Sequence, residues 1–126
     1  LRYFNTYGPY QIAQFVIPKF IRNVLNNRPP VIYGDGNQVR SYNYSEDTAI
    51  GTVDALLSNK TDKITLNIGN SDSLITLKEL GELVIRLCGK EKEMNIKINN
   101  NFETGQLRSF PSSFERFWMA GGRILR

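Results

Sequence analysis

The sequence predicts a mixed α/β fold of one domain, because segments with helical spacing of apolar residues alternate with short extended runs. The helical pattern occurs at residues 15–26, 45–57 and 76–88, and the extended runs lie at 2–4, 31–33, 65–68 and 95–98. Glycine-containing turns follow several of these segments, as expected between elements of a folded chain. With 126 residues, the chain is long enough to bury one hydrophobic core.

The first predicted helix begins near Val16. Val16, Phe20 and Val24 recur at helical spacing, which places them on one face of the helix. Pro18 is compatible with a helix only in its first turn, where the N–H that proline lacks would have no intrahelical partner. We therefore expect the helix to begin no more than a few residues before Pro18.

The second and third predicted helices have recognisable N-termini. Ser45 resembles an N-cap residue, with Glu46 and Asp47 placed favourably beside the positive end of the helix dipole. Thr76 and Glu79 have the spacing of a capping box, in which each residue binds the backbone of the other. We expect one helix to begin after Ser45 and the other after Thr76.

The third helix has the clearest apolar stripe. Leu80, Leu83, Val84 and Leu87 lie on one face at helical spacing, and we expect them to pack into the core. Gly89 follows the stripe, and glycine is the residue that most often ends a helix.

The composition argues against several classes of protein. The 16 Lys and Arg residues give a net charge of +4 but are scattered, so we expect a solvated surface and no nucleic-acid partner. The absence of histidine disfavours a metal site and a histidine-based catalytic triad. No apolar run approaches the roughly 20 residues of a membrane-spanning helix, so we expect no membrane association. The single cysteine, Cys88, cannot form an internal disulfide, which favours a cytoplasmic protein.

Two segments that end in turns contain residues suited to ligand binding. Asn5 directly follows the extended run 2–4 and begins a loop predicted at residues 5–9. Its amide can contact a ligand there, although asparagine also commonly begins a turn. Tyr33 precedes the turn at residues 34–36, whose glycines allow close approach of a planar base but are equally typical of an ordinary turn. The strand end at residues 67–70 offers further polar contacts to a ribose or base.

Arg40 lies in a third candidate segment, residues 38–47. A guanidinium can bind a pyrophosphate through two parallel charge-assisted hydrogen bonds, or it can form an ion pair with Glu46 or Asp47. Tyr42 and Tyr44 alternate around Asn43, so in an extended segment they would share one face, with Asn43 on the other.

Five motifs occur together in a fixed order along the chain. They are RYFNTYGP at residues 2–9, VIPKFI at 16–21, PPVIYGDG at 29–36, QVRSYNYSED at 38–47 and LNIGN at 66–70. In this order and spacing they resemble the extended short-chain dehydrogenase/reductase family, and more narrowly its nucleotide-sugar epimerases, dehydratases and decarboxylases. The resemblance covers residues 1–98.

The resemblance implies a fold and a function. In that family a Rossmann domain binds NAD, a smaller C-terminal domain binds the nucleotide diphosphate of the sugar, and a hydride passes from the sugar to NAD and usually returns. Residues 1–98 would then form the C-terminal substrate-binding lobe of a partial Rossmann-like α/β enzyme whose N-terminal dinucleotide-binding half is missing. A UDP- or dTDP-linked sugar is the expected partner, and the full-length enzyme is expected to be a homodimer.

The resemblance also implies roles for individual residues. Asn5 matches a residue that contacts the phosphate or sugar of the substrate, and Arg40 matches the arginine that binds the pyrophosphate. Val16 matches a residue that lines the base pocket, and Tyr33 matches one that packs beside the uracil or thymine.

Two further matches concern the cofactor. Tyr3 and Thr6 match backbone positions beside the nicotinamide of NAD. The family's glycine-rich dinucleotide motif does not occur in the chain, and no tyrosine is followed four residues later by lysine, the spacing of the catalytic pair. We therefore expect that the isolated chain has no turnover.

Residues 99–126 depart from the family pattern. The family places a second phosphate-binding arginine after the last strand, a position for which Arg108 is a candidate, and then a charged helix. This tail is instead apolar and aromatic, and Ser113 is suited to cap a short helix with Phe114, Phe117 and Trp118 on one face. We expect a truncation or a change of reading frame near residue 104.

Two other functions are compatible with parts of the sequence. A stand-alone module that binds sugar nucleotides without catalysis would be monodisperse and would bind its ligand unaided, whereas the lobe of a larger enzyme would expose apolar surface where the missing half packs. A small basic protein that binds nucleic acid through Arg40, Tyr42 and Tyr44 would show a steep salt dependence. The scattered charges disfavour the second alternative.

Overall fold

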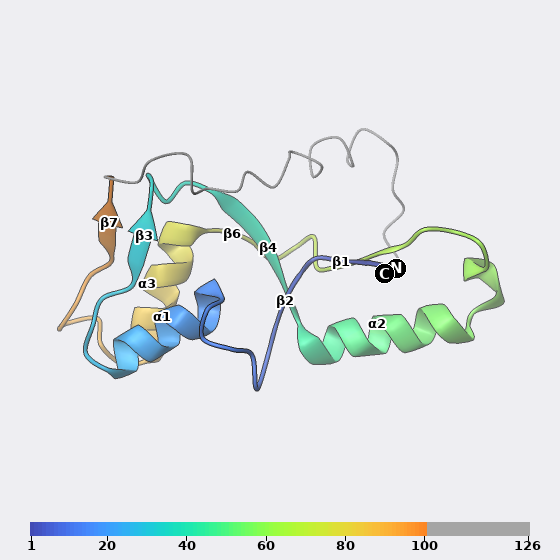
Figure 1. The fold of residues 1–126 in the computed structure, drawn as a ribbon, viewed down its shortest axis with the longest axis horizontal. Coiled ribbons are helices and arrows are strands. Elements are labelled where there is room, and N and C mark those ends of the chain that lie inside the picture. Colours follow the sequence, from blue (N-terminus) through green and yellow to red (C-terminus); the bar gives the residue numbers. More distant parts are fainter. Residues whose placement is uncertain (101–126) are drawn as a thin grey trace.

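A computed structural model describes residues 1–100 of the chain, which form an elongated α/β arrangement (Figure 1). The elements are β1 (Arg2–Tyr3), β2 (Asn5–Tyr7), α1 (Val16–Leu25), β3 (Val31–Tyr33), β4 (Val39–Tyr44), α2 (Ser45–Leu57), a short 3₁₀ helix η1 (Asn59–Thr61), β5 (Asn67–Ile68), β6 (Leu74–Thr76), α3 (Leu77–Leu87) and β7 (Lys97–Asn99). Helices α1 and α3 lie with β3 and β7 at one end, and α2 lies with β1 at the other (Figure 1). The predicted α/β class is confirmed.

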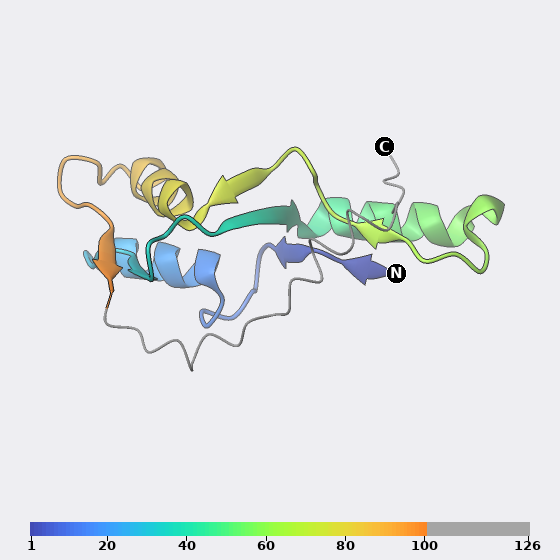
Figure 2. The ribbon, with the colours of Figure 1, turned by 90° about the horizontal axis from the view of Figure 1, so that it is seen from above.

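The strands form three small sheets. β1 pairs with β5 and β3 pairs with β7, both in parallel. In the central sheet, β4 pairs in parallel with β2 and in antiparallel with β6. Figure 2 shows β4 running between the two ends of the molecule.

Strand β2 corrects one sequence prediction. Residues 5–9 were expected to form a loop, but Asn5–Tyr7 pair in register with Tyr42–Tyr44 of β4. The local sequence ends in Gly8-Pro9, which is typical of a turn, whereas the strand depends on a partner far along the chain. Only the second half of the predicted loop lies outside a strand.

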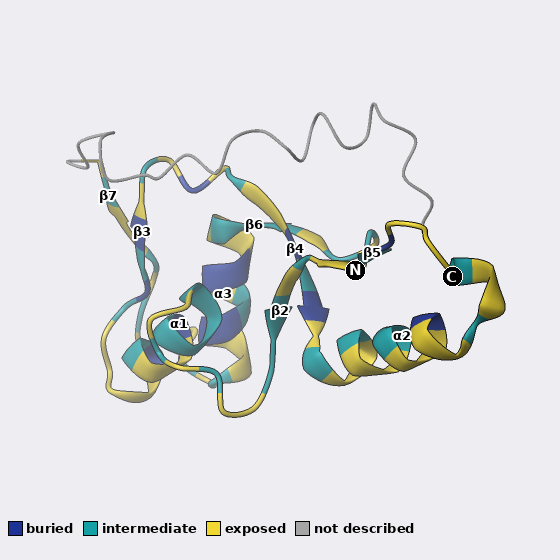
Figure 3. Cartoon of the chain, turned by 45° about the vertical axis from the view of Figure 1, so that its right-hand side comes forward, coloured by how far each residue is buried: buried dark blue, intermediate teal, exposed yellow. Residues whose placement is uncertain are grey.

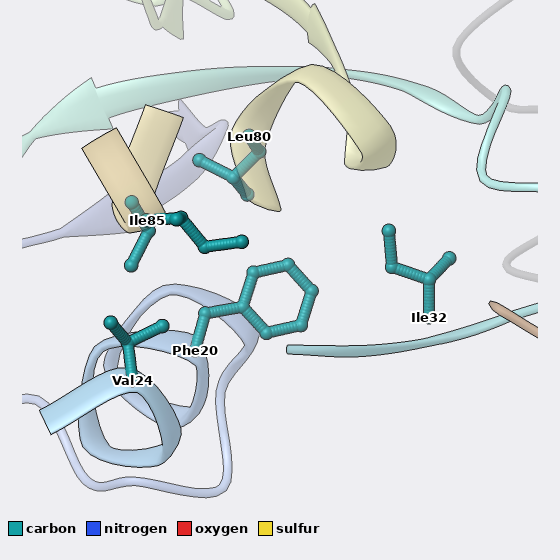
Figure 4. Close-up of a cluster of buried hydrophobic side chains, with 6 residues drawn as sticks. Phe20, Val24, Ile32, Leu80 and Ile85 are labelled. Carbon is teal, nitrogen blue, oxygen red and sulfur yellow. The ribbon is translucent and has the colours of Figure 1, made fainter. Parts of the chain in front are cut away.

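One hydrophobic core joins α1 to α3. Its buried side chains come from α1, β3 and α3: Phe20, Val24, Ile32, Leu80, Val84 and Ile85 (Figure 4). The predicted stripe of α3 is therefore only partly buried, because Leu87 is 77% exposed and Leu83 is half-buried. The buried face of α3 instead extends to Ile85, on the other side of Leu80 and Val84.

Both ends of α3 are closed as the sequence predicts. The Thr76 hydroxyl accepts a hydrogen bond from the Glu79 N–H at 3.1 Å, and the Glu79 carboxylate accepts one from the Thr76 N–H at 2.8 Å. These hydrogen bonds from Thr76 lower the pKa of Glu79. At the C-terminus Gly89 has a φ of 69°, and the Lys90 N–H donates to the carbonyl of Ile85 at 3.0 Å, as in a Schellman motif.

The start of α2 differs from the prediction. Ser45 is already helical, and the N-cap position belongs to Tyr44, whose extended backbone has φ −70° and ψ 143° and whose side chain does not cap the helix. Strand β4 runs directly into α2, so no residue is left between the two elements to act as a polar cap. Glu46 and Asp47 do lie in the first turn, as expected.

Helix α2 is buried at a single residue, Ala55. Figure 3 shows how much of its surface is exposed. Leu56 is 81% exposed and Leu57 is 76% exposed, and Ile50 and Val53 are also exposed. The helix thus has an apolar surface that residues 1–100 do not cover.

Several sequence predictions lie outside the described residues. These concern Arg108, the helix beginning at Ser113 and the change near residue 104, and the domain boundary at residue 98 stays a prediction. β7 was expected at 95–98 and is found at Lys97–Asn99. Within residues 1–100, no helix is both long and apolar enough to cross a membrane, and no group of acidic, Cys or His residues is arranged to hold a metal ion.

Replacement of Thr76 by Ala tests the capping box. The variant loses the hydroxyl that accepts from the Glu79 N–H, so we expect its free energy of unfolding to fall by roughly 1 kcal/mol. Urea unfolding at neutral pH measures this change. Thr65→Ala, at an exposed threonine outside the helices and strands, is the control and should change stability much less. Equal losses in the two variants would contradict the assigned cap.

The loss of stability in Thr76→Ala should also depend on pH. Because the folded-state pKa of Glu79 is lowered, its contribution is complete above the ordinary glutamate pKa of about 4.3 and is lost as the pH falls through the lower folded value. The difference in stability between wild type and Thr76→Ala should therefore be constant at neutral pH and shrink below about pH 4.

Gly8→Ala tests the close contact between the end of β2 and the start of α2. A Cβ atom on Gly8 would collide with the Ser45 hydroxyl and lie 2.8 Å from the Ser45 Cβ. We expect the free energy of unfolding to fall by about 1–3 kcal/mol, as in other overpacked sites. Ser45→Gly removes both colliding atoms, so the double variant should lose less than the sum of the single variants. If the losses of the two single variants simply add in the double variant, the destabilisation by Gly8→Ala does not come from its contact with Ser45.

Candidate functional site

The central sheet places two of the predicted site residues on one face. Arg40 and Tyr42 alternate along β4 and so point to the same side. Asn5 pairs with Tyr42, and Ile75 of β6 pairs with Arg40, which puts both on that side as well. Tyr42 and Ile75 pack against the α1–α3 core, so Asn5 and Arg40 belong to the face of the sheet that meets this core.

The opposite face of the central sheet packs on α2. Asn43 is buried and its side-chain amide donates to the Thr48 hydroxyl at 2.6 Å. Thr6, which pairs with Asn43, also lies near that hydroxyl, with the two oxygens 3.4 Å apart. The predicted separation of Asn43 from Tyr42 and Tyr44 is therefore confirmed.

Asn5 lies in a strand rather than at the beginning of a turn. Its residue is exposed, and its side-chain nitrogen donates to the carbonyl oxygen of Ser41 in β4 at 3.2 Å. This bond ties the Asn5 side chain to β4, next to Arg40. It also fixes where the amide is presented on the sheet.

Arg40 has the contacts of an accessible cation. Its guanidinium donates to the Val39 carbonyl at 3.2 Å and to the Gln38 side-chain oxygen at 3.5 Å, both neutral acceptors. The alternative ion pair of Arg40 with Glu46 or Asp47 is not formed. Within residues 1–100, the salt bridge observed joins Lys90 to Glu93. The side chain is exposed, so a bound anion can reach it without displacing a carboxylate.

Two opposing effects act on the pKa of Tyr42. Burial raises the pKa of its hydroxyl, and the positive charge of Arg40 lowers it to a smaller extent. The Tyr42 ring meets that of Tyr7 edge to face, with 6.5 Å between the ring centroids. The Tyr44 ring also contacts the Tyr7 ring, with 5.6 Å between the ring centroids. The aromatic rings of β4 are thus packed on another ring of the same chain.

Val16 and Tyr33 lie on neighbouring elements at the α1–α3 end. Val16 is the first residue of α1 and packs against the core. Tyr33 ends β3, directly before Gly34, whose φ of 83° marks the predicted turn. The Lys19 ammonium, one helical turn after Val16, lies 5.5 Å from the centroid of the Tyr33 ring.

Lys19 is a candidate that sequence reasoning missed. A lysine in a helix is ordinarily a solvated surface residue, and nothing in residues 16–21 connects it to Tyr33. Its spacing of three residues from Val16 was the available signal, because residues three apart are neighbours on a helix. The structure adds a second cation to the candidate site.

Tyr3 and Thr6, the expected cofactor residues, both have side chains engaged within the chain. The Tyr3 hydroxyl accepts a hydrogen bond from Thr52 of α2 at 3.3 Å, and the Thr6 hydroxyl donates to the Phe4 carbonyl at 3.2 Å. Their side chains are thus held on or beside α2. This arrangement is compatible with a role for their backbone, which is what the family resemblance implies.

The segment at residues 67–70 has a structural role. The Asn70 carbonyl accepts hydrogen bonds from the Ser41 hydroxyl at 2.5 Å and from the Ser73 hydroxyl at 3.3 Å. A Cβ atom on Gly69 would overlap the ring of Phe4, so this position must remain glycine for the two strands to pack. These groups thus support β1 and β4, and the contacts of this segment to a ribose or base stay a prediction.

The chain matches known proteins across most of its described length. The sequence model of the NAD dependent epimerase/dehydratase family matches residues 1–69. A UDP-glucuronate 4-epimerase from Thermodesulfobacterium geofontis is 34% identical over 91 residues, which are 72% of this chain and 28% of that protein. The human dTDP-D-glucose 4,6-dehydratase is 32% identical over 123 residues, or 94% of this chain and 35% of that protein.

Solved structures agree with the sequence relatives. The crystal structure of a UDP-glucuronic acid 4-epimerase from Bacillus cereus in complex with NAD matches with a TM-score of 0.70 and 29% identity, over 79% of this chain and 32% of that one. The chain thus spans about a third of the length of the relatives that it matches. The family match covers more than half of the chain and agrees with the observed α/β fold. The chain therefore belongs to the NAD dependent epimerase/dehydratase family.

Proposed function

We propose that the chain is the sugar-nucleotide-binding lobe of an NAD-dependent epimerase or dehydratase. The observation that carries the proposal is the pair Asn5 and Arg40, which β2 and β4 present on one face of the central sheet. An amide and a guanidinium side by side suit a ligand that has both hydroxyl and phosphate oxygens. The family and the named substrates of its relatives, UDP- and dTDP-linked sugars, agree with this chemistry.

Arg40 would bind the diphosphate. Its present partners are two neutral oxygens, which an anion can replace with stronger, charge-assisted hydrogen bonds. Asn5 would bind the adjoining phosphate or sugar oxygen, with its position fixed by the bond to Ser41.

Val16 and Tyr33 would form the pocket for the base. Tyr33 supplies an aromatic ring for packing beside uracil or thymine, and Val16 supplies an apolar wall. Lys19, above the Tyr33 ring, would add positive charge at the same end of the ligand. The proposal therefore assigns the two cations of the site, Arg40 and Lys19, to one anionic ligand.

NAD would be bound mainly by a part of the enzyme outside this chain. Tyr3 and Thr6 lie on β1 and β2 with their side chains engaged within the chain, so only their backbone would line the nicotinamide. When bound, NAD accepts a hydride from the sugar and returns it. Because the chain has no Tyr-x-x-x-Lys sequence, we expect no turnover from the isolated chain.

Helix α2 supports a lobe rather than a stand-alone module. Ile50 and Leu57 lie seven residues apart, two helical turns, and so share a face of α2, and both are exposed. β1 and β5 beside this helix form a parallel pair, an arrangement usually buried on both faces in complete proteins. We infer that the dinucleotide-binding part of the enzyme packs here, which fits the greater length of the relatives.

The arrangement of the tyrosines disfavours the nucleic-acid alternative. That function needs open aromatic faces on which bases can stack. Tyr42 and Tyr44 instead contact Tyr7, and Tyr42 is half-buried.

Arg40→Ala tests the proposed diphosphate contact. The lost charge-assisted bonds are worth about 1.5–3 kcal/mol, so we expect the affinity for UDP and dTDP to fall at least tenfold. Isothermal titration of each nucleotide into the folded chain measures the change. Arg28→Ala, at an exposed arginine in the connection between α1 and β3, is the matched control and should bind like wild type. Unchanged affinity in Arg40→Ala, or no binding by wild type, would reject the proposal.

The double variant Ile50→Gln/Leu57→Gln tests the open face of α2. If this face normally packs on another part of the enzyme, the wild-type chain should self-associate through it at micromolar concentration. We expect sedimentation velocity to show associated wild-type chain and a larger fraction of monomer for the variant. A wild-type chain that remains monodisperse at this concentration would favour the stand-alone module.

A further inference from the structure

The connection between β2 and α1 carries an exposed aromatic side chain on a strained backbone. Residues 8–15 form this connection, which runs from the central sheet to the α1–α3 end of the molecule (Figure 1). Tyr10 has a φ of 66°, in the left-handed region that bulky residues rarely adopt. It is 103% exposed, so no part of residues 1–100 covers its ring. The chain therefore bears the cost of this conformation without any packing gain among these residues.

The other left-handed residues differ from Tyr10 in their side chains. Within residues 1–100, the residues other than glycine with a positive φ are Tyr10, Asn27 and Lys63. Asn27 follows the C-cap of α1, a position that is often left-handed and that asparagine tolerates well. Lys63 lies in a turn after η1 and keeps its charged side chain in water. A large aromatic ring gains nothing from water, and strained backbone that persists is found mostly where ligands bind.

Two hydrogen bonds fix the turn that carries Tyr10. The Gln11 side-chain amide donates to the Thr6 carbonyl at 3.0 Å, and the Gln11 N–H donates to the Gly8 carbonyl at 3.4 Å. These bonds fold residue 11 back against β2, at the residue next to Asn5. Because consecutive Cα atoms are about 3.8 Å apart, Tyr10 is held close to the same part of β2. Its ring is thus presented to solvent at a defined place.

This place is where the sugar of the ligand belongs. In the proposed function, Arg40 binds the diphosphate and the backbone of Thr6 lies beside the nicotinamide. A sugar that gives a hydride to the nicotinamide must lie between these two groups, beside Asn5. The turn is bonded to Thr6 itself, so it borders the sugar rather than the base.

A tyrosine side chain suits a sugar. A hexose presents C–H groups on its faces and hydroxyls around its edge. The phenol offers an apolar ring face to the first and an O–H group that both donates and accepts to the second. Few rotatable bonds have to be fixed in a tyrosine, so little conformational entropy is lost when it binds.

We propose that Tyr10 packs on the sugar of the sugar nucleotide and that the strained turn at residues 8–11 holds its ring in position. The assignment rests on the proposed function. It adds a residue for the part of the ligand that Arg40 does not bind.

Tyr10→Gly separates this role from a structural one. Glycine adopts a positive φ without strain, so the midpoint of urea unfolding should not fall below that of wild type. The affinity for UDP-glucose, measured by isothermal titration, should fall roughly threefold or more, as expected for the loss of one aromatic contact. The affinity for UDP, which has no sugar beyond the diphosphate, should be unchanged.

Two further variants serve as controls. Asn27→Gly also replaces a left-handed residue by glycine, but beyond the C-terminus of α1, and should leave both affinities unchanged. Tyr10→Phe keeps the ring and should bind UDP-glucose with nearly the affinity of wild type.

Three results would overturn the assignment of Tyr10. The first is a Tyr10→Gly variant that binds UDP-glucose like wild type, and the second is an equal loss of affinity for UDP. The third is a loss in Tyr10→Phe as large as that in Tyr10→Gly, because the ring would then not be the contact. A wild-type chain that does not bind UDP would instead reject the proposed function, and with it this assignment.

Discussion

The parallel pairing of β2 with β4 is the constraint on which the rest of the structure depends. Parallel neighbours cannot be joined by a tight turn, so the chain between them forms α1 and β3, and α1 with α3 builds the core. The register sets Asn5 opposite Tyr42. A shift of one residue would move Asn5 to the face that packs on α2, away from Arg40.

Polar contacts hold this register. The Asn5 amide binds the Ser41 carbonyl across the two strands, and on the other face Asn43 binds Thr48 of α2. Breaking the second contact would leave the buried side-chain amide of Asn43 without its hydrogen-bond partner, which costs about 1–3 kcal/mol. A shift in the register of the strands is therefore unfavourable on both faces of the sheet. The same groups that fix the fold therefore also position the candidate site, and Asn5 combines both roles.

Local signals predicted the helices well, and non-local pairing explains most of what they missed. The start of α1 near Val16 and the capping box of α3 depend on neighbouring residues, which the sequence displays directly. β2 was missed because its partner lies beyond α1 and β3. Ser45 was misassigned because its cap propensity is local, whereas the helix start is set by how β4 enters α2. Lys19 was missed because its association with Tyr33 exists only after folding.

The positive charge of Arg40 affects the pKa of Tyr42, which lies on the same face of β4. The Arg40 charge favours the ionised form of the Tyr42 hydroxyl and so offsets part of the rise in pKa that burial causes. An anion bound to Arg40 would cancel that charge, and the pKa of Tyr42 would then rise further. Its hydroxyl would remain protonated and able to donate a hydrogen bond. Because burial already raises this pKa above the ordinary tyrosine value of about 10, the Tyr42 hydroxyl is neutral with or without an anion at Arg40, and a diphosphate bound to Arg40 would meet a hydrogen-bond donor on the same face of the sheet.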